Sequence, residues 1–280
     1  MRLIDMLIFA CYPMAVFAQP APPSPDPHPH AVGCHAQTSC ALGDRSYHVK
    51  LPDDWDGVTP MPVMLHFHGW ARQGTLIVKH GRISGATRRR GVLLLAPNGL
   101  NRSWDFWHPG SDDTDFADAV LADAASKYPI DPNRIYVSGY SWGSAMAWRF
   151  ACENGVGVRA LLAVSGTLDQ DETCETAPTE VRHVHGTTDT VMDFPFGPNG
   201  DTTFPVSLWR LRLNCGNGMD QGDWRVTDKD LFSRTVWDCD DGQVVLDVHP
   251  RGHFIPVGWF ARQLDELLAA DASDPAQLLK

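Results

Sequence analysis

Short apolar runs alternate with amphipathic segments along most of the chain. The apolar runs are four to six residues long and rich in Val, Ile, Leu and Phe, which favours buried strands; they cover 46–51, 63–67, 92–96, 135–138, 160–164, 182–185 and 244–249. Apolar residues three or four apart, such as Phe116, Val120 and Ala124, predict helices over 115–127, 142–151 and 259–269. Strands that alternate with helices predict an α/β fold, a mostly parallel sheet with helices on both faces.

Composition narrows the class of protein. The chain has 280 residues, of which 43% are hydrophobic and 20% charged, so it can bury the core of a single α/β domain. Its net charge is −11, and its longest basic run is Arg88-Arg89-Arg90. This balance disfavours nucleic acid and anionic membrane surfaces as partners. It leaves the oligomeric state open.

The first 33 residues differ from the rest. Residues 1–18 place Arg2 before an apolar stretch and end on Val16 and Ala18, the small residues of a signal cleavage site. The stretch is too short to span a bilayer, so we expect a secreted protein without stable membrane insertion. A lipoprotein anchor at Cys11 is the weaker alternative. Residues 19–33 are dense in proline and predict an extended tether, which leaves 34–280 as the folded domain.

The cysteines agree with an oxidising compartment. Signal removal takes Cys11 away and leaves six cysteines, an even number that allows 15 connectivities. Because neighbouring cysteines bracket short loops, we predict the disulfides Cys34–Cys40, Cys152–Cys174 and Cys215–Cys239. No C-x2-C pair is present, so zinc is not expected, and no other metal site is predicted.

A nucleophile motif lies between a predicted strand and a predicted helix. Gly139-Tyr140-Ser141-Trp142-Gly143 is a G-x-S-x-G sequence that follows strand 135–138 directly. In such a turn the serine adopts a strained backbone conformation at a helix N-terminus, where it is exposed to a substrate. The alternative is an ordinary turn in which Ser141 caps the helix. The strand before it and the helix after it favour a catalytic serine.

A serine nucleophile needs a base and a carboxylate that orients the base. His253 follows Gly252 in the loop after the last predicted strand, where the base is expected, and His249 at the strand end is its rival. Asp189 is the first carboxylate after strand 182–185 and is the predicted acid, with Asp193 as the alternative.

The oxyanion of an ester intermediate needs two hydrogen-bond donors. We expect the backbone N–H of Trp142, after the serine, and that of Trp70, in the loop after strand 63–67. His68 in the same loop is expected to brace it by hydrogen bonds. The chain contains no glycine-rich nucleotide loop, so no cofactor is predicted.

Several of the ten tryptophans fall in or beside the loops after the strands. Aromatic side chains there suit a polymer, a cinnamoyl ring or a sugar face. The candidate substrate-binding residues are Trp70, Trp104, Trp107 and Trp142. For Trp104 and Trp107, packing in the core is an equally good interpretation.

Together these stretches resemble the secreted α/β-hydrolase esterases of the polyhydroxybutyrate depolymerase-like and feruloyl esterase-like group. The resemblance covers about residues 33–269. Besides the serine motif, it rests on His68-Gly69, Ala96-Pro97-Asn98-Gly99, Ser103-Trp104, residues 130–137, His185-Gly186-Thr187-Thr188-Asp189 and Gly252-His253. The serine, aspartate and histidine of the family fall on Ser141, Asp189 and His253. Two positions depart from it: Trp142 stands where relatives often have Asn, and His253-Phe254-Ile255-Pro256 replaces their His-Thr-Trp-Pro.

The resemblance implies a single-domain α/β-hydrolase fold and a secreted serine carboxylic-ester hydrolase that forms an acyl-enzyme. Its ester substrate would be a short-chain polyester of the polyhydroxybutyrate type. The alternative within the group is a feruloyl or acetyl xylan esterase acting on plant cell-wall esters. An alternative of another class is a binding module on an inactive hydrolase scaffold.

Overall fold

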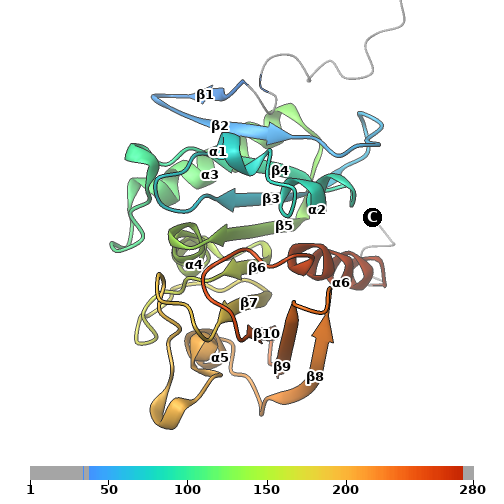
Figure 1. Cartoon of the computed structure of the whole chain (residues 1–280). Coiled ribbons are helices and arrows are strands. Elements are labelled where there is room, and N and C mark those ends of the chain that lie inside the picture. Colours follow the sequence, from blue (N-terminus) through green and yellow to red (C-terminus); the bar gives the residue numbers. More distant parts are fainter. Residues whose placement is uncertain (1–33, 35–37, 274–280) are drawn as a thin grey trace, which may run out of the picture.

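A computed structural model describes Cys34 and residues 38–273, which build one ten-stranded sheet (Figure 1). The spatial order of the strands is β1-β2-β4-β3-β5-β6-β7-β10-β9-β8. The six central strands β4, β3, β5, β6, β7 and β10 are parallel to one another. In the pairs at the two edges, β1 with β2 and β9 with β8, the strands are antiparallel to each other, and each pair joins the central strands by antiparallel pairing. The strands are β1 Cys40–Leu42, β2 Arg45–Lys50, β3 Met61–Phe67, β4 Leu93–Pro97, β5 Ile130–Tyr140, β6 Val158–Val164, β7 Glu180–Gly186, β8 Met219–Arg225, β9 Leu231–Cys239 and β10 Gly242–His249.

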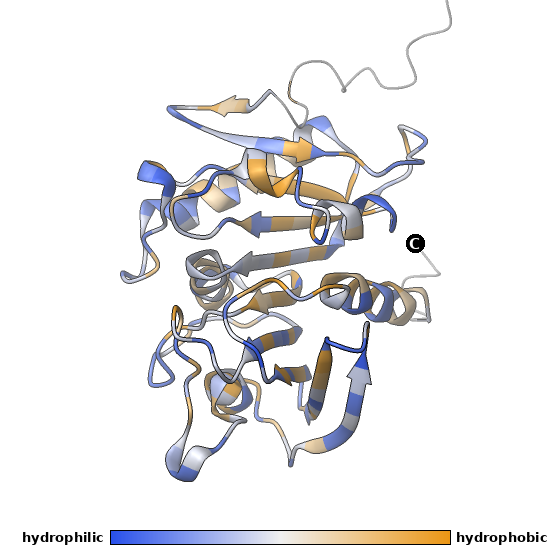
Figure 2. Cartoon of the chain, viewed as in Figure 1, coloured by the Kyte–Doolittle hydropathy of each residue, from blue (hydrophilic) through white to orange (hydrophobic). Residues whose placement is uncertain are grey.

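Helices cover both faces of the sheet, and each face has its own core. One core joins the sheet to α3, α4 and α5, and the other joins it to α1, α2 and α6. The helices are α1 Gly74–Ile77, α2 Ser84–Arg88, α3 Asp112–Lys127, α4 Trp142–Asn154, α5 Ser207–Arg212 and α6 Trp259–Ser273, with short 3-10 turns η1 Leu100–Arg102, η2 Pro198–Gly200 and η3 Phe204–Val206. In Figure 2 hydrophobic colours recur along the strands, whereas many polar residues lie in the outer loops.

The predicted fold class is confirmed. Each of the seven predicted strands overlaps an observed one, and the three predicted helices correspond to α3, α4 and α6. The antiparallel pair β8 and β9 was not predicted. β8 lies at the sheet edge and is almost wholly exposed, so it lacks the apolar run that marks the buried strands.

The structure pairs the six cysteines as predicted. Cys34–Cys40 ties down the start of the described chain, Cys152–Cys174 joins α4 to the loop after β6, and Cys215–Cys239 joins the loop after α5 to β9. No helix in the described ranges is long and apolar enough to cross a membrane. The predicted signal segment 1–18, with Cys11, and the tether 19–33 lie outside the described residues.

Candidate active site

Ser141 occupies a sharp turn between β5 and α4. Its backbone angles are φ 60° and ψ −127°, a conformation that costs free energy for a residue with a side chain. The turn is held because Ser141 N–H donates to the carbonyl of Val164 on β6 at 2.9 Å. The two glycines of the motif are required by close packing. A Cβ at Gly139 would lie 1.9 Å from the Gly143 carbonyl oxygen, and one at Gly143 would lie 2.1 Å from that of Phe67.

His253 lies between Ser141 and a carboxylate. Its Nε2 is 2.9 Å from Ser141 Oγ and its Nδ1 is 2.7 Å from Asp189 Oδ2. The three residues follow β5, β7 and β10, so the carboxyl ends of the parallel strands bring them together. The sequence therefore predicted a set of residues that the structure does place in hydrogen-bond contact.

The rival residues do not join this set. His249 is 2% exposed, and its Nδ1 accepts the Arg251 N–H at 3.2 Å while its ring packs against Phe232 and Phe254. Asp193 is exposed and contacts neither Ser141 nor His253 within the described structure. Within the described residues, neither rival side chain makes a hydrogen bond with Ser141, whereas His253 does.

Asp189 is buried, 4% exposed, yet it is held in its ionised form. Burial raises its pKa, but hydrogen bonds from His185, His253 and the Val191 N–H outweigh burial and hold the pKa of Asp189 well below its usual range. Its Oδ1 accepts the N–H groups of Val191 at 2.9 Å and Met192 at 3.1 Å. A carboxylate fixed in this way accepts Nδ1–H of His253, which leaves Nε2 free to accept the Ser141 proton.

Two buried histidines, His185 beside Asp189 and His183 behind it in the hydrogen-bond chain, were not predicted as part of the site. His185 Nε2 lies 2.8 Å from the Met192 carbonyl oxygen and 3.4 Å from Asp189 Oδ2, so its proton is shared between them. Its Nδ1 is 3.2 Å from Nε2 of His183, which is fully buried. His183 and His185 could have been recognised from the sequence, because both lie in the predicted strand 182–185 and buried polar side chains at a strand end need hydrogen-bond partners.

The loop after β3 supplies Trp70, and His68 braces it as expected. His68 is fully buried; its Nδ1–H donates to the Gly69 carbonyl at 2.9 Å and its Nε2 accepts the Gly99 N–H at 3.0 Å. Burial lowers the pKa of His68 to about 4, which keeps it neutral and suited to both bonds.

Two backbone donors remain free beside Ser141. Within the described part of the chain, neither the Trp70 N–H nor the Trp142 N–H has a hydrogen-bond partner. Both residues line a cleft of about 360 Å³ together with Ser141, His253 and Arg72. Free N–H groups beside a nucleophile are what an oxyanion site requires.

The four predicted substrate-binding tryptophans separate into two groups. Trp70 and Trp107 are 63% and 59% exposed, and each ring centroid lies 5.9 Å from that of Trp142 between them. Trp104 is only 3% exposed, and its Nε1–H donates to the His68 carbonyl at 2.7 Å. Of the two interpretations given for Trp104, this burial favours packing in the core, where the indole supports the His68 loop.

The described residues contain no group of three or more His, Cys, Asp or Glu side chains arranged to hold a metal ion. The residues around Ser141 instead make the set needed for nucleophilic attack: a hydroxyl, a base, an ionised acid and two free donors.

Comparison with known proteins points the same way. Residues 114–220 match the family model described as Phospholipase/Carboxylesterase. This range includes Ser141 and Asp189 and ends before His253, so it covers only part of the site.

Two of the similar curated proteins are fungal enzymes. “Probable feruloyl esterase C” of Aspergillus niger is 27% identical over 175 residues, which is 59% of this chain and 64% of that protein. “Feruloyl esterase C” of Emericella nidulans is 27% identical over 184 residues, 61% of this chain and 67% of that protein. The chain thus spans about 64% of the length of the first of these relatives.

Solved structures show the fold. The acetyl xylan esterase from Aspergillus awamori superposes with a TM-score of 0.60 at 13% identity, over 80% of this chain and 94% of that one. A Bacillus cereus carboxylesterase gives a TM-score of 0.52 at 15% identity, over 81% of this chain and 95% of that one. The described chain has the α/β-hydrolase fold.

Proposed function

We propose that this chain of α/β-hydrolase fold is a serine carboxylic-ester hydrolase that works through an acyl-enzyme. The observation that supports it most is the hydrogen-bonded sequence Ser141, His253, Asp189, with distances of 2.9 and 2.7 Å, at a strained serine turn. A structural serine would need neither the strain nor the buried acid. The same intact set argues against a non-catalytic binding module.

The geometry supports a two-step reaction. Ser141 Oγ attacks the ester carbonyl carbon while His253 Nε2 takes its proton, and Asp189 stabilises the imidazolium that forms. In this proposal the oxyanion accepts hydrogen bonds from the N–H groups of Trp70 and Trp142, which line the cleft together with Ser141. The intermediate collapses to an acyl-serine as His253 returns the proton to the leaving alcohol. Water, deprotonated by His253, then releases the acid and restores Ser141.

For the substrate, we favour esters of aromatic acids from plant cell walls. The curated relatives are named feruloyl esterases, and the exposed tryptophans beside Ser141 offer flat faces to a cinnamoyl ring. The polyester substrate expected from the sequence receives no support from the comparisons. Acetyl xylan remains a second candidate, because the Aspergillus awamori enzyme that bears this name shares the fold.

Export to an oxidising compartment is part of the proposal. Three disulfides, one of which joins cysteines only 6 positions apart, fit a protein that folds outside the reducing cytosol.

The test is a hydrolysis panel with purified protein. We expect turnover of methyl ferulate to exceed that of hydroxybutyrate oligomers, with acetylated xylan between them. Ser141→Ala should abolish release of every acid, because no other group can form the acyl intermediate. Turnover of hydroxybutyrate oligomers alone would restore the polyester interpretation. Hydrolysis that survives in Ser141→Ala would exclude the mechanism.

A further inference from the structure

A second pocket adjoins the Ser141 cleft. It has a volume of about 410 Å³, and its lining includes Trp107, Trp142, Asp105, Asp112 and Asn101. We call it the Trp107 pocket. Trp142 also lines the Ser141 cleft, so the two hollows share this residue. A molecule bound at Ser141 can extend past Trp142 into this pocket.

The Trp107 side chain is held by ring contacts and is nevertheless open to solvent. Trp107 packs against Phe106 with ring centroids 4.1 Å apart, and its ring is nearly perpendicular to that of Trp142, at 86°. Even so, 59% of Trp107 is exposed. A large apolar ring kept in water by a fixed loop suits a ligand that covers it.

The polar side chains of the pocket have unused hydrogen-bonding capacity. The side chains of Asn101, Ser103 and Asp112 make no hydrogen bond within the described structure, and Asp105 pairs only with the exposed His108, at 2.9 Å. Asp113 is different. It is buried, bonds Arg45 at 2.6 Å and accepts the Asp105 N–H, and therefore supports the pocket wall.

The charge of the lining is one-sided. The pocket contains three aspartates and neither Lys nor Arg among its lining residues. Arg45, which lies behind Asp113, offsets one of these charges. Asp105 and Asp112 thus present negative charge to anything that enters, and a cleft lined by one sign of charge repels ligands of the same sign.

We propose that the Trp107 pocket binds a neutral sugar ring attached to the ester and discriminates against uronic acids. A pyranose or furanose ring offers a face of C–H groups that stacks on an indole, while its hydroxyls donate to carboxylate and amide oxygens. A uronic acid would bring a carboxylate beside Asp105 and Asp112. The inference rests on the proposed function for the ester itself, but sugar binding does not depend on hydrolysis.

The first test measures binding without turnover. Ser141→Ala protein is titrated with a neutral arabinoxylan oligosaccharide and with an oligogalacturonate of the same length, at low ionic strength. We expect the neutral oligosaccharide to bind at least about tenfold more tightly, and added salt to narrow the difference because it screens the charges. Equal affinity, or tighter binding of the oligogalacturonate, would overturn the proposal.

Single substitutions test whether the oligosaccharide binds in the Trp107 pocket. Trp107→Ala in the Ser141→Ala protein should weaken binding of the neutral oligosaccharide about tenfold or more, by loss of one stacked face. Asp112→Asn should reduce the discrimination against oligogalacturonate. The control is Leu211→Ala, a residue 80% exposed on α5 and outside both hollows, which should leave both affinities as they are. Unchanged binding in Trp107→Ala would overturn the assignment.

The second test uses the active protein and separates the two proposals. The ratio of kcat/KM for a feruloylated arabinose ester to that for methyl ferulate should fall about tenfold in Trp107→Ala. A ratio that stays constant while both esters are hydrolysed would reject the pocket and keep the esterase. Oligosaccharide binding without any ester turnover would reject the esterase and keep the pocket.

Discussion

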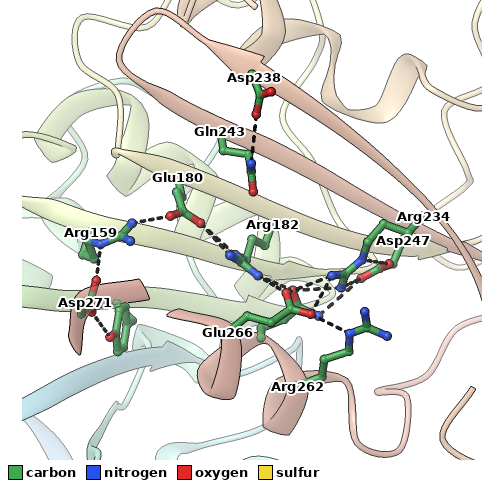
Figure 3. A network of polar contacts seen from close by, with 12 residues as sticks. Arg159, Glu180, Arg182, Arg234, Asp238, Gln243, Asp247, Arg262, Glu266 and Asp271 are labelled. Carbon is green, nitrogen blue, oxygen red and sulfur yellow. Dashed lines mark hydrogen bonds and ion pairs between the residues drawn. The ribbon is translucent and has the colours of Figure 1, made fainter. Parts of the chain in front are cut away.

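Two regions of the molecule, the edge of the sheet around Ser141 and the layer of charged side chains under α6, use polar groups in opposite ways. At the catalytic edge, Ser141 has a strained backbone and the Trp70 and Trp142 N–H groups lack partners within the described structure. Under α6, by contrast, charged side chains from four strands pair with the helix (Figure 3). We call this set the α6 network: Arg159, Glu180, Arg182, Arg234, Asp247, Glu266 and Asp271.

Each charged side chain of the α6 network has an oppositely charged partner within ion-pair distance. Arg234 makes paired hydrogen bonds to both oxygens of Asp247, each at 2.8 Å, and also reaches Glu266 at 2.8 Å. Burial raises the pKa of Glu266, but the guanidinium groups of Arg262, Arg234 and Arg182 outweigh it and lower the pKa. Charges that are paired in this way stay ionised and hold their positions.

The two regions are connected through Trp259. Its Nε1–H donates to Asp247 Oδ2 at 2.8 Å, at the start of α6 and six positions after His253. Trp259 therefore joins the network to the start of the helix that follows the His253 loop. We infer that the paired charges under α6 stabilise the neighbouring structure. This stability offsets the free-energy cost of the strained Ser141 backbone and of the two N–H groups without partners.

The largest effect is expected at Asp189, the proposed catalytic acid. Asp189→Asn should lower kcat/KM by about four orders of magnitude, because the amide favours the wrong tautomer of His253, whereas the melting temperature should change much less. Ester turnover and thermal unfolding, measured on the same sample, check this. Asp193→Asn is the matched control and should remain active. A damaged Asp193→Asn beside an active Asp189→Asn would assign the acid to Asp193.

A substitution in the α6 network should have the opposite effect: it should lower the stability of the fold and change ester turnover much less. Asp247→Asn leaves Arg234 buried without its full partner, so we expect a loss of about 3 to 5 kcal/mol in the free energy of unfolding. The folded fraction should retain ester turnover. Arg262→Gln removes a partly exposed pair with Glu266 and the contact of the guanidinium with the Trp224 ring, 4.2 Å away, and should cost only about 1 kcal/mol. Equal losses in the two variants would show that the network adds no special stability.

Acid should destabilise the region behind the catalytic acid through His249. Burial lowers the pKa of His249 to about 4, below the value of about 6.5 expected for an unfolded chain. The unfolded state therefore binds the proton first, and stability falls as the pH drops from about 6.5 toward 4. His249→Asn keeps an acceptor for the Arg251 N–H and removes the titration.

Chemical denaturation of wild type and His249→Asn at pH 6 and pH 5 measures this contribution. The wild type should lose about 1 kcal/mol more than the variant over that interval. Parallel losses would mean that His249 is not held neutral in the folded state.

The sequence predicted the catalytic edge better than the network. The serine, the base and the acid follow apolar strands, and α/β topology places the ends of such strands together, so Ser141, Asp189 and His253 were accessible from order alone. Short spacings likewise predicted the three disulfides. Arg234 and Asp247 were not recognised, because a charged residue inside a strand gives no sign of which distant residue will pair with it.

The burial of individual tryptophans is a second feature that the sequence did not predict. Trp104 and Trp107 are three positions apart in one loop, yet one is buried and the other more than half exposed. Their difference arises because the His68 carbonyl accepts the Trp104 indole N–H, a contact between segments 36 residues apart. Local sequence predicts that aromatic residues gather near the site, but tertiary hydrogen bonds decide which of them face the substrate.

The central claim is that Ser141 is a nucleophile activated by His253. The most direct test is reaction with a fluorophosphonate, in which the serine oxygen attacks phosphorus and fluoride leaves, followed by intact-mass and peptide analysis. We predict one added group per chain, on Ser141, and at least about a thousandfold slower labelling of His253→Ala, because the serine then lacks its base. Labelling at another residue, or at the same rate in His253→Ala, would contradict the account.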